Sequence, residues 1–276
     1  MGKSCSGIMK LASKITGCII WSGNYPQNRK VQCYVNHDQY EQGSSKVVSI
    51  IYKLILTMLK DFGALPPHCH INLDNCWREN KNMYLFSFLS ALVQLDVFVD
   101  ITVDFMLVGH TGNQVDQIFS ILASEFKSEI RSPDDLLDKI RTSAIQPQPL
   151  CEELYYIWNF RDFIKPKMSD KRLVNHSFLH SFLVKKESGV AVLRGRKYPQ
   201  DSCDWKPKDG IKLLKDNATF EEVDVAELRV EKLNMDAVFS GLYSKYIPQL
   251  PESEQREVTA SWERMKSSLE NLSKKA

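Results

Sequence analysis

The sequence predicts an α/β domain, and two features of its first 130 residues carry this interpretation. Segments rich in β-branched residues alternate with segments whose apolar residues recur at helical spacing. Gly, Pro, Ser and Asn separate these segments, as is typical of turns. With 276 residues, of which 43% are apolar and 25% charged, the chain is able to bury a substantial core. The alternation therefore favours strands and helices packed in layers.

The first half begins with a predicted hairpin, because two β-rich runs are separated by the turn-forming residues Ser22-Gly23-Asn24-Tyr25-Pro26. A serine at 44 or 45 is a plausible N-cap for the helix that follows, which should end near Gly63. The expected elements, in order, are strands at 16–21 and 30–36, a helix at 47–59, a strand at 69–73, a helix at 80–95, a strand at 101–108 and a helix at 114–126.

Beyond residue 130 the character of the sequence changes. A short helix and then a linker are expected between Pro133 and Pro149. Farther on, we expect a hairpin of 176–184 and 190–197 and a closing amphipathic helix at 258–272. The predicted organisation is a domain at 14–130, a linker at 131–149 and a smaller, mixed α+β region at 150–276.

Composition limits the classes of protein to which the chain belongs. Seven cysteines without a C-x-x-C pair predict free thiols in a reducing compartment, nuclear or cytoplasmic. The longest apolar runs are interrupted by polar residues and are too short for a membrane span, so we expect a soluble protein. The start Met1-Gly2-Lys3-Ser4-Cys5-Ser6 fits the pattern for N-myristoylation, although a short polar N-terminus is the plainer interpretation.

Basic residues gather in one part of the chain. From Arg161 to Lys197 there are ten basic and three acidic residues, a net charge of +7, whereas the whole chain carries only +2. Such a cluster indicates a surface for a polyanion, and a solvated basic face is the commoner alternative. The side chains that we expect to contact nucleic acid in this segment are Lys185, Lys186, Arg194 and Arg196.

Two aspartates are candidates for a catalytic metal site. Asp74 directly follows the strand at 69–73, and Asp116 lies in the first turn of the helix after the neighbouring strand. If these strands are parallel, both carboxylates approach one sheet edge, where they would bind Mg²⁺ or Mn²⁺ for phosphoryl chemistry. The alternative is that Asp74 caps a turn and Asp116 stabilises a helix N-terminus.

Further polar residues are expected to border the same cleft. His110 would act beside the metal or as a proton carrier, and four residues would contact nucleic acid: Asn75, Asn80, Lys81 and Asn82. A zinc site at His68, Cys69, His70 and Cys76 is disfavoured. The two histidines share one face of a strand and Cys69 points to the other.

Two motifs carry a resemblance to a known family: D-N-x-x-x-x-N-K-N at 74–82 and G-H-T-x-x-x-x-D at 109–116, preceded by G-S-S-K-V-V-S-I at 43–50. On these motifs the chain resembles an uncharacterised domain family that is abundant in invertebrate, fish and fungal genomes, often in mobile-element-like genes. The similarity continues through His176-Ser177-Phe178, Trp205-Lys206-Pro207 and residues 246–251.

That family in turn resembles the ribonuclease H-like catalytic core of DDE-type transposases and integrases. The resemblance implies a mixed sheet flanked by helices and three acids that bind two metal ions, with Asp74 matching the second acid and Asp116 the third. A first-strand acid is absent, because residues 1–37 contain no Asp or Glu and Asp38 follows the wrong strand. Asp104 is a weak substitute because it lies in mid-strand. We therefore expect the first strand to be missing from this fold.

These observations favour a transposon-derived protein that associates with nucleic acid, DNA rather than RNA, and whose catalysis is impaired. One Mg²⁺ or Mn²⁺ ion at most would be held well. Two alternatives stay open. One is an active two-metal nuclease or DNA strand transferase completed by an upstream acid, and the other is a protein-interaction module that retains only the fold. An oligomer is possible under each of the three.

Overall fold

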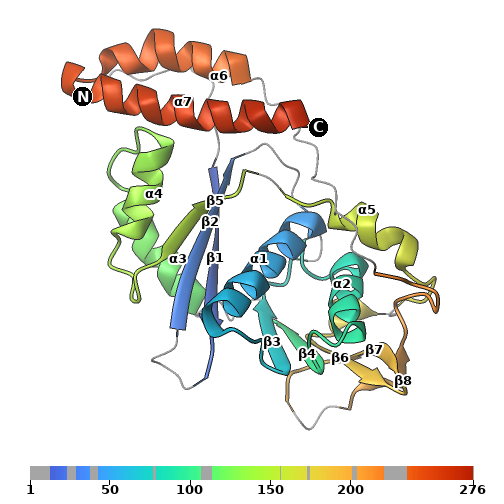
Figure 1. Ribbon diagram of the computed structural model, residues 1–276. Coiled ribbons are helices and arrows are strands. Elements are labelled where there is room, and N and C mark those ends of the chain that lie inside the picture. Colours follow the sequence, from blue (N-terminus) through green and yellow to red (C-terminus); the bar gives the residue numbers. More distant parts are fainter. Residues whose placement is uncertain are drawn as a thin grey trace. The chain divides into compact units, whose positions relative to one another are not determined.

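The computed structural model describes residues 13–23, 29–37, 43–76, 79–106, 114–155, 157–172, 175–200, 204–220 and 235–275 (Figure 1). The chain folds into two compact units. Unit 1 comprises residues 1–41, 112–156 and 228–276, and unit 2 comprises residues 42–111 and 157–227. Each unit combines segments from both halves of the chain, so neither is a continuous stretch of sequence.

Unit 1 contains a three-stranded sheet with the order β1-β2-β5. β1 (Ser13–Trp21) pairs with β2 (Arg29–His37) in an uninterrupted antiparallel register, which confirms the predicted hairpin. β5 (Leu150–Glu153) lies parallel to β2. Alternate side chains of β2, namely Val31, Cys33 and Val35, are at most 1% exposed and form the centre of this unit's core.

Two helices pack on the sheet of unit 1. α3 (Gln114–Glu125) contributes Ile118 and Leu122 to the core, and α4 (Pro133–Arg141) contributes Leu136, Leu137 and Ile140. The approach of α3 is close at Gly17, where an added Cβ would lie 3.3 Å from the ring of Phe119. The segment 131–149 therefore carries a packed helix of unit 1, with Ser132 as its N-cap.

The C-terminal part of unit 1 is a helical hairpin. α6 (Met235–Gly241) continues through the π-helical segment η3 (Leu242–Tyr246) and the 3₁₀ segment η4 (Ile247–Gln249) to α7 (Glu252–Lys275). α6 and α7 lie side by side (Figure 1), with the ring of Phe239 edge-on to Trp262 at 6.2 Å. α7 begins six residues before the predicted start at 258.

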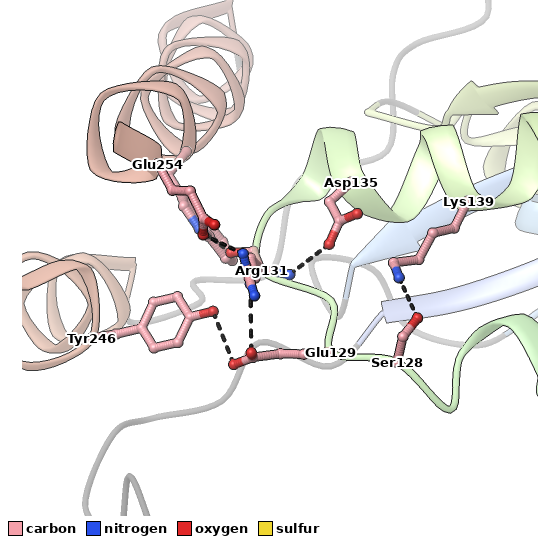
Figure 2. Close-up of polar contacts among 8 residues, drawn as sticks. Ser128, Glu129, Arg131, Asp135, Lys139, Tyr246 and Glu254 are labelled. Atoms are coloured by element: carbon pink, nitrogen blue, oxygen red, sulfur yellow. Dashed lines mark hydrogen bonds and ion pairs between the residues drawn. The ribbon is translucent and has the colours of Figure 1, made fainter. Parts of the chain in front are cut away.

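A polar contact attaches this hairpin to the residues before α4 (Figure 2). The Arg131 guanidinium lies against the carboxylates of Glu129, at 3.4 Å, and Glu254. Tyr246 donates a hydrogen bond to Glu129 at 3.5 Å, and the indole N–H of Trp262 donates to the carbonyl of Arg131 at 3.1 Å. The segment before α4 is therefore joined to α7 by an ion pair, Arg131 with Glu254, and by a neutral hydrogen bond from Trp262.

Unit 2 is built on a five-stranded sheet with the order β3-β4-β6-β7-β8. The strands are β3 (His68–Leu73), β4 (Asp100–Phe105), β6 (Ser181–Glu187), β7 (Val190–Arg196) and β8 (Lys206–Ile211). β3 and β4 are parallel, whereas the other neighbours are antiparallel. The β6–β7 hairpin was predicted, but it begins at Ser181, because His176–Phe178 forms a 3₁₀ turn, η2, instead of a strand.

One face of this sheet is apolar and is covered by α1 (Ser44–Phe62), α2 (Met83–Gln94) and α5 (Phe160–Ile164), which leads into the 3₁₀ turn η1 (Lys165–Lys167). The ring of Phe86 in α2 lies 4.6 Å from that of Phe182 and 6.3 Å from that of Phe105. The helix predicted at 80–95 therefore packs apolar residues on the sheet, although α2 itself starts at Met83.

The G-S-S-K-V-V-S-I motif at 43–50 has a structural role within unit 2. Ser45 and Ser49 are buried on α1, and their hydroxyls accept hydrogen bonds from the backbone N–H groups of Arg161 and Trp158, both at 3.1 Å. The motif therefore fastens the α5 segment to α1.

Together the two units confirm the predicted α/β class: two mixed sheets flanked by helices. In the part of the chain that the structure describes, no helix is both long enough and apolar enough to cross a membrane.

The described cysteines are free thiols, and burial makes four of them poor nucleophiles. Burial raises the pKa of Cys33 and Cys69 to about 11 and that of Cys18 and Cys151 to about 12. At pH 8 we expect these thiols in the folded protein to react with iodoacetamide at least about 100-fold more slowly than the same thiols unfolded in guanidinium chloride. The reason is that only the thiolate attacks, and a raised pKa lowers the thiolate fraction. Peptide mapping by mass spectrometry measures the rates, and equal rates in both conditions would contradict the prediction.

Candidate functional site

Polar side chains of unit 2 gather at one end of its sheet. Because β3 and β4 are parallel and β6 is antiparallel to them, the carboxyl ends of β3, β4 and β7 lie beside the start of β6. Ser181 is the register partner of both Asp104 and Arg196. We call the side chains at this end the carboxyl-end cluster: His70, Asp74, Asn75, Asn80, Lys81, Asp104, His180, Ser181 and Arg196.

The D-N-x-x-x-x-N-K-N motif forms a hydrogen-bonded loop between β3 and α2. Oδ1 of Asp74 accepts hydrogen bonds from the side-chain amide of Asn80 and, at 3.1 Å, from the backbone N–H of Cys76. Asn82 is the N-cap of α2, and its Oδ1 accepts from the backbone N–H groups of Tyr84 and Leu85, both at 3.1 Å. The spacing of the motif therefore matches the requirements of a loop that closes on itself and starts a helix.

Lys81 is the least usual member of this loop because its side chain is buried. The residue is 2% exposed, and its Nζ donates hydrogen bonds to Oδ1 of Asn75 at 3.1 Å and to the carbonyl of Ser177 at 3.2 Å. The ammonium also lies 5.1 Å from the centre of the Phe105 ring. Within the described residues no carboxylate lies at ion-pair distance from Lys81. Burial lowers the pKa of Lys81 to about 8.

His180 directly precedes β6, and its backbone bonds to the ends of β4 and β7. Its carbonyl accepts a hydrogen bond from the N–H of Phe105 at 2.7 Å, and its own N–H donates to the carbonyl of Arg196 at 3.1 Å. Nδ1 of its ring is buried and has no hydrogen-bond partner among the described residues. Burial, and then the positive charge of Lys81, lower the pKa of His180, so this imidazole favours the neutral form.

A histidine–aspartate pair lies on the polar face of the sheet, opposite the helices. Nε2 of His70 is 2.8 Å from Oδ2 of Asp104. The hydrogen bond to Asp104 raises the pKa of His70. Burial acts to raise the pKa of Asp104, but hydrogen bonds from His70 and Ser181 and the charges of His70 and Arg196 outweigh it, so the pKa is lowered. Asp104 therefore favours the carboxylate form, and its other oxygen, Oδ1, is buried without a hydrogen-bond partner among the described residues.

Arg196 is the one member of the predicted basic surface that belongs to the cluster. Its Nε donates to Oγ of Ser181 at 3.4 Å, and its guanidinium lies 4.2 Å from the ring centre of Trp205. A cation–π contact of this kind restricts the orientation of an arginine without removing its charge.

The other expected nucleic-acid contacts in the basic segment lie elsewhere on the sheet. Lys185 is the register partner of Asp100, at the opposite end of β4 from the cluster. Lys186 forms an ion pair with Asp96, and Arg194 forms a two-pronged pair with Glu187, one arm of it at 2.6 Å. These pairs partly neutralise the excess positive charge that the sequence has between Arg161 and Lys197.

The two aspartates proposed for metal binding belong to different units. Asp74 follows β3 in unit 2, whereas Asp116 lies in the first turn of α3 in unit 1, and His110 lies outside the described residues. Among the residues with described positions, no three or more His, Cys, Asp or Glu side chains are grouped to hold a metal ion. Oδ1 of Asp74 faces two hydrogen-bond donors, which compete with a cation for the same oxygen. Joint binding of Mg²⁺ or Mn²⁺ by Asp74, Asp116 and His110 therefore stays a prediction.

Sequence reasoning missed His180, Trp205 and the pairing of His70 with Asp104 as members of a site. A weak signal was present, because Asp104 interrupts the apolar strand from Ile101 to Phe105. His180 carried no local signal, since its position depends on the pairing of β6 with β4.

Comparisons with known proteins identify a family without a described activity. Residues 3–201 match the model of a family described as a domain of unknown function, DUF7869. No curated protein and no solved structure matches the chain.

The burial of Lys81 leads to a prediction about stability. A lysine whose folded-state pKa lies below its unfolded value, about 10.4, binds fewer protons in the folded state, so the contribution of Lys81 to the stability of the folded protein rises with pH from about 8 to about 10.5. The variant Lys81→Met lacks this titration. We therefore expect the melting temperature of the variant minus that of the wild type to fall as pH increases from 7 to 10. Differential scanning fluorimetry measures the melting temperature of both proteins at each pH. Two parallel pH profiles would show that the charge of Lys81 does not destabilise the folded protein.

Proposed function

This chain belongs to the DUF7869 family, and we propose that it associates with nucleic acid through the carboxyl-end cluster of unit 2. In this proposal the cluster binds the phosphate backbone, and Lys81 and Arg196 supply the positive charge. DNA is the preferred nucleic acid, as the resemblance to transposases and integrases implies.

The single observation that carries the proposal is the buried ammonium of Lys81. A buried charge costs free energy unless an opposite charge compensates for it. Two neutral oxygens and one aromatic ring surround the ammonium, and the described residues supply no carboxylate at ion-pair distance. An anionic ligand that approaches this end of the sheet would provide the missing compensation. The phosphodiester backbone of a nucleic acid places a negative charge at each nucleotide, so neighbouring phosphates are able to compensate for both cations of the carboxyl-end cluster, Lys81 and Arg196.

Two further features of the same end favour an anion. The N-terminus of α2 begins directly after Lys81, and the peptide dipoles of a helix make its N-terminus positive. Arg196 adds a guanidinium held in place by Trp205. The acidic members of the cluster oppose this field only in part, because Asp104 pairs with His70 and Asp74 accepts two hydrogen bonds.

We also propose that the protein derives from a transposon-encoded ribonuclease H-like protein. The support is the motif resemblance, together with the chain order of elements from β1 to α3, although the strands of this series belong to two sheets. Shared ancestry and fold do not require Asp74 to keep a catalytic role. The hydrogen bonds on its carboxylate favour a structural role in the loop.

Binding to nucleic acid should depend on salt and on the cations of the cluster. For the full chain with a fluorescent DNA oligonucleotide, we expect affinity to fall steeply between 50 and 200 mM salt, roughly the range in which counterion release dominates. Lys81→Met and Arg196→Gln should each weaken binding about fivefold or more and reduce the salt slope by about one. Fluorescence anisotropy at several salt concentrations measures both quantities.

Lys185→Gln is the matched control for this experiment, because Lys185 is an exposed cation of the same sheet at its opposite end. It should change affinity less than Arg196→Gln. Equal losses for the two variants would point to a diffuse basic surface instead of a site, and unchanged affinity in Lys81→Met would remove the main support for the proposal.

Cleavage or joining of nucleic acid is not expected at a measurable rate. Because a first-strand acid is absent, a second metal ion would have too few oxygen ligands. Loss of one preorganised electrostatic contact typically reduces rate by about 10² to 10³. Labelled single-stranded, duplex and hybrid substrates in Mg²⁺ or Mn²⁺ provide the assay. Cleavage by the wild type that an Asp74→Ala, Asp116→Ala variant abolishes would favour the nuclease alternative.

A further inference from the structure

We propose that Phe178 is a stacking platform for an unpaired base, so that the nucleic acid bound by unit 2 is single-stranded at this point. The inference rests on the proposed function above and specifies its ligand. It assigns the phosphate backbone to the cations of the carboxyl-end cluster and one base to the ring of Phe178.

Phe178 is exposed to an unusual degree for an aromatic residue in a folded unit. Its exposed fraction is 70%, the highest among the exposed large hydrophobic side chains of the described residues. Within that part of the chain its ring makes no contact with another aromatic ring or with a cation. An apolar ring in water is a site where burial by a ligand releases free energy.

The turn that carries Phe178 is fixed by contacts on both sides. The carbonyl of Ser177, one residue earlier, accepts the hydrogen bond from Lys81, and the N–H of Phe178 itself donates to the carbonyl of Asn175 at 3.0 Å. Leu179, one residue later, packs against the core of unit 2, where a Cβ added at Gly195 would lie 2.6 Å from it. The ring is therefore held out from a rigid turn, and little conformational entropy is lost when a ligand covers it.

Lys81 also joins the ring to the anion-binding part of the site. The ammonium of Lys81, which has no carboxylate partner among the described residues, donates a hydrogen bond to the carbonyl of Ser177 in the turn that carries Phe178. The proposed phosphate position and the exposed ring are therefore linked by this hydrogen bond. Cations and aromatic rings alternate beyond it, since Arg196 lies over Trp205 and Nζ of Lys197 lies 5.2 Å from the ring centre of Tyr198. A basic surface interleaved with aromatic rings is typical of proteins that bind single strands.

The choice of a single strand follows from the chemistry of stacking. In a duplex, both faces of an internal base are covered by neighbouring base pairs, so a protein ring reaches a base face only at an end or after unstacking. A single strand offers a base face at each nucleotide together with a flexible backbone. One exposed ring beside a buried cation therefore fits a single strand better than an intact duplex.

The test uses the full chain and three labelled ligands of about 12 nucleotides, a length within the usual range for one single-strand site. The ligands are oligothymidylate, an abasic strand with the same phosphate backbone, and a blunt duplex. Phe178→Ala should weaken oligothymidylate binding about 5- to 100-fold, the usual value of one stacked base, and should leave abasic-strand binding unchanged. Phe178→Trp should restore binding to oligothymidylate, because a larger ring offers the same stacking surface.

Phe62→Ala is the matched control. Phe62 is also an exposed phenylalanine of unit 2, 48% exposed, but it ends α1 just before β3 begins and so lies at the opposite end of the sheet. We expect its removal to leave the affinity for all three ligands unchanged. Thermal melts of each variant verify that the fold is intact.

The outcomes separate this inference from the function on which it rests. If oligothymidylate binds in a salt-dependent way but Phe178→Ala binds as tightly as the wild type, the stacking inference is wrong and the proposed function stands. An equal loss for the oligothymidylate and abasic strands in Phe178→Ala also overturns stacking, since no base is involved. If none of the three ligands binds the wild type at low salt, the proposed function itself fails.

Discussion

The pairing of β6 with β4 is the constraint on which the rest of unit 2 depends. It joins residues near position 100 to residues near position 185 in one sheet, and it sets Asp104 opposite Ser181. The rings of Phe86, Phe105 and Phe182 pack together on the apolar side of this pairing, so the register is fixed by burial as well as by backbone hydrogen bonds. A shift of one residue would turn Phe182 to the polar face. The carboxyl-end cluster exists only because that register holds.

The loop from Asp74 to Asn82 holds the ammonium of Lys81 in a buried position, where a charge costs free energy. Asp74 and Asn82 close the loop and cap α2, whereas Lys81 extends its ammonium to Asn75 and to the carbonyl of Ser177. Most of the D-N-x-x-x-x-N-K-N motif is therefore explained by local structure. Lys81 is the member that local structure does not explain, because a neutral residue would fill the same space without a desolvation cost. A residue that reduces stability is a candidate for a role in binding.

Local sequence signals predicted the elements well where each element satisfies its own hydrogen bonds. The β1–β2 hairpin, α1 and α3 follow from alternation, helical spacing and turn residues, and the structure differs from the prediction by a few residues at their ends. The start of α2 was placed three residues too early because Asn80 and Lys81 belong to the preceding loop. His176–Phe178 was predicted as part of a strand, but hydrogen bonds within the turn and the contact with Lys81 hold it as a 3₁₀ turn.

The sequence by itself determined the α/β class, the cation-rich segment and the polar loop after β3, since composition, spacing and capping act over a few residues at a time. Only the tertiary structure decided which of these residues meet. It assigned Asp74 to unit 2 and Asp116 to unit 1, and it separated Arg196 from Lys185 by the length of a strand. It also buried Lys81 beneath the turn that exposes Phe178. The physical reason is that burial and strand register depend on partners about 100 positions away, and no local pattern records which distant segment will supply them.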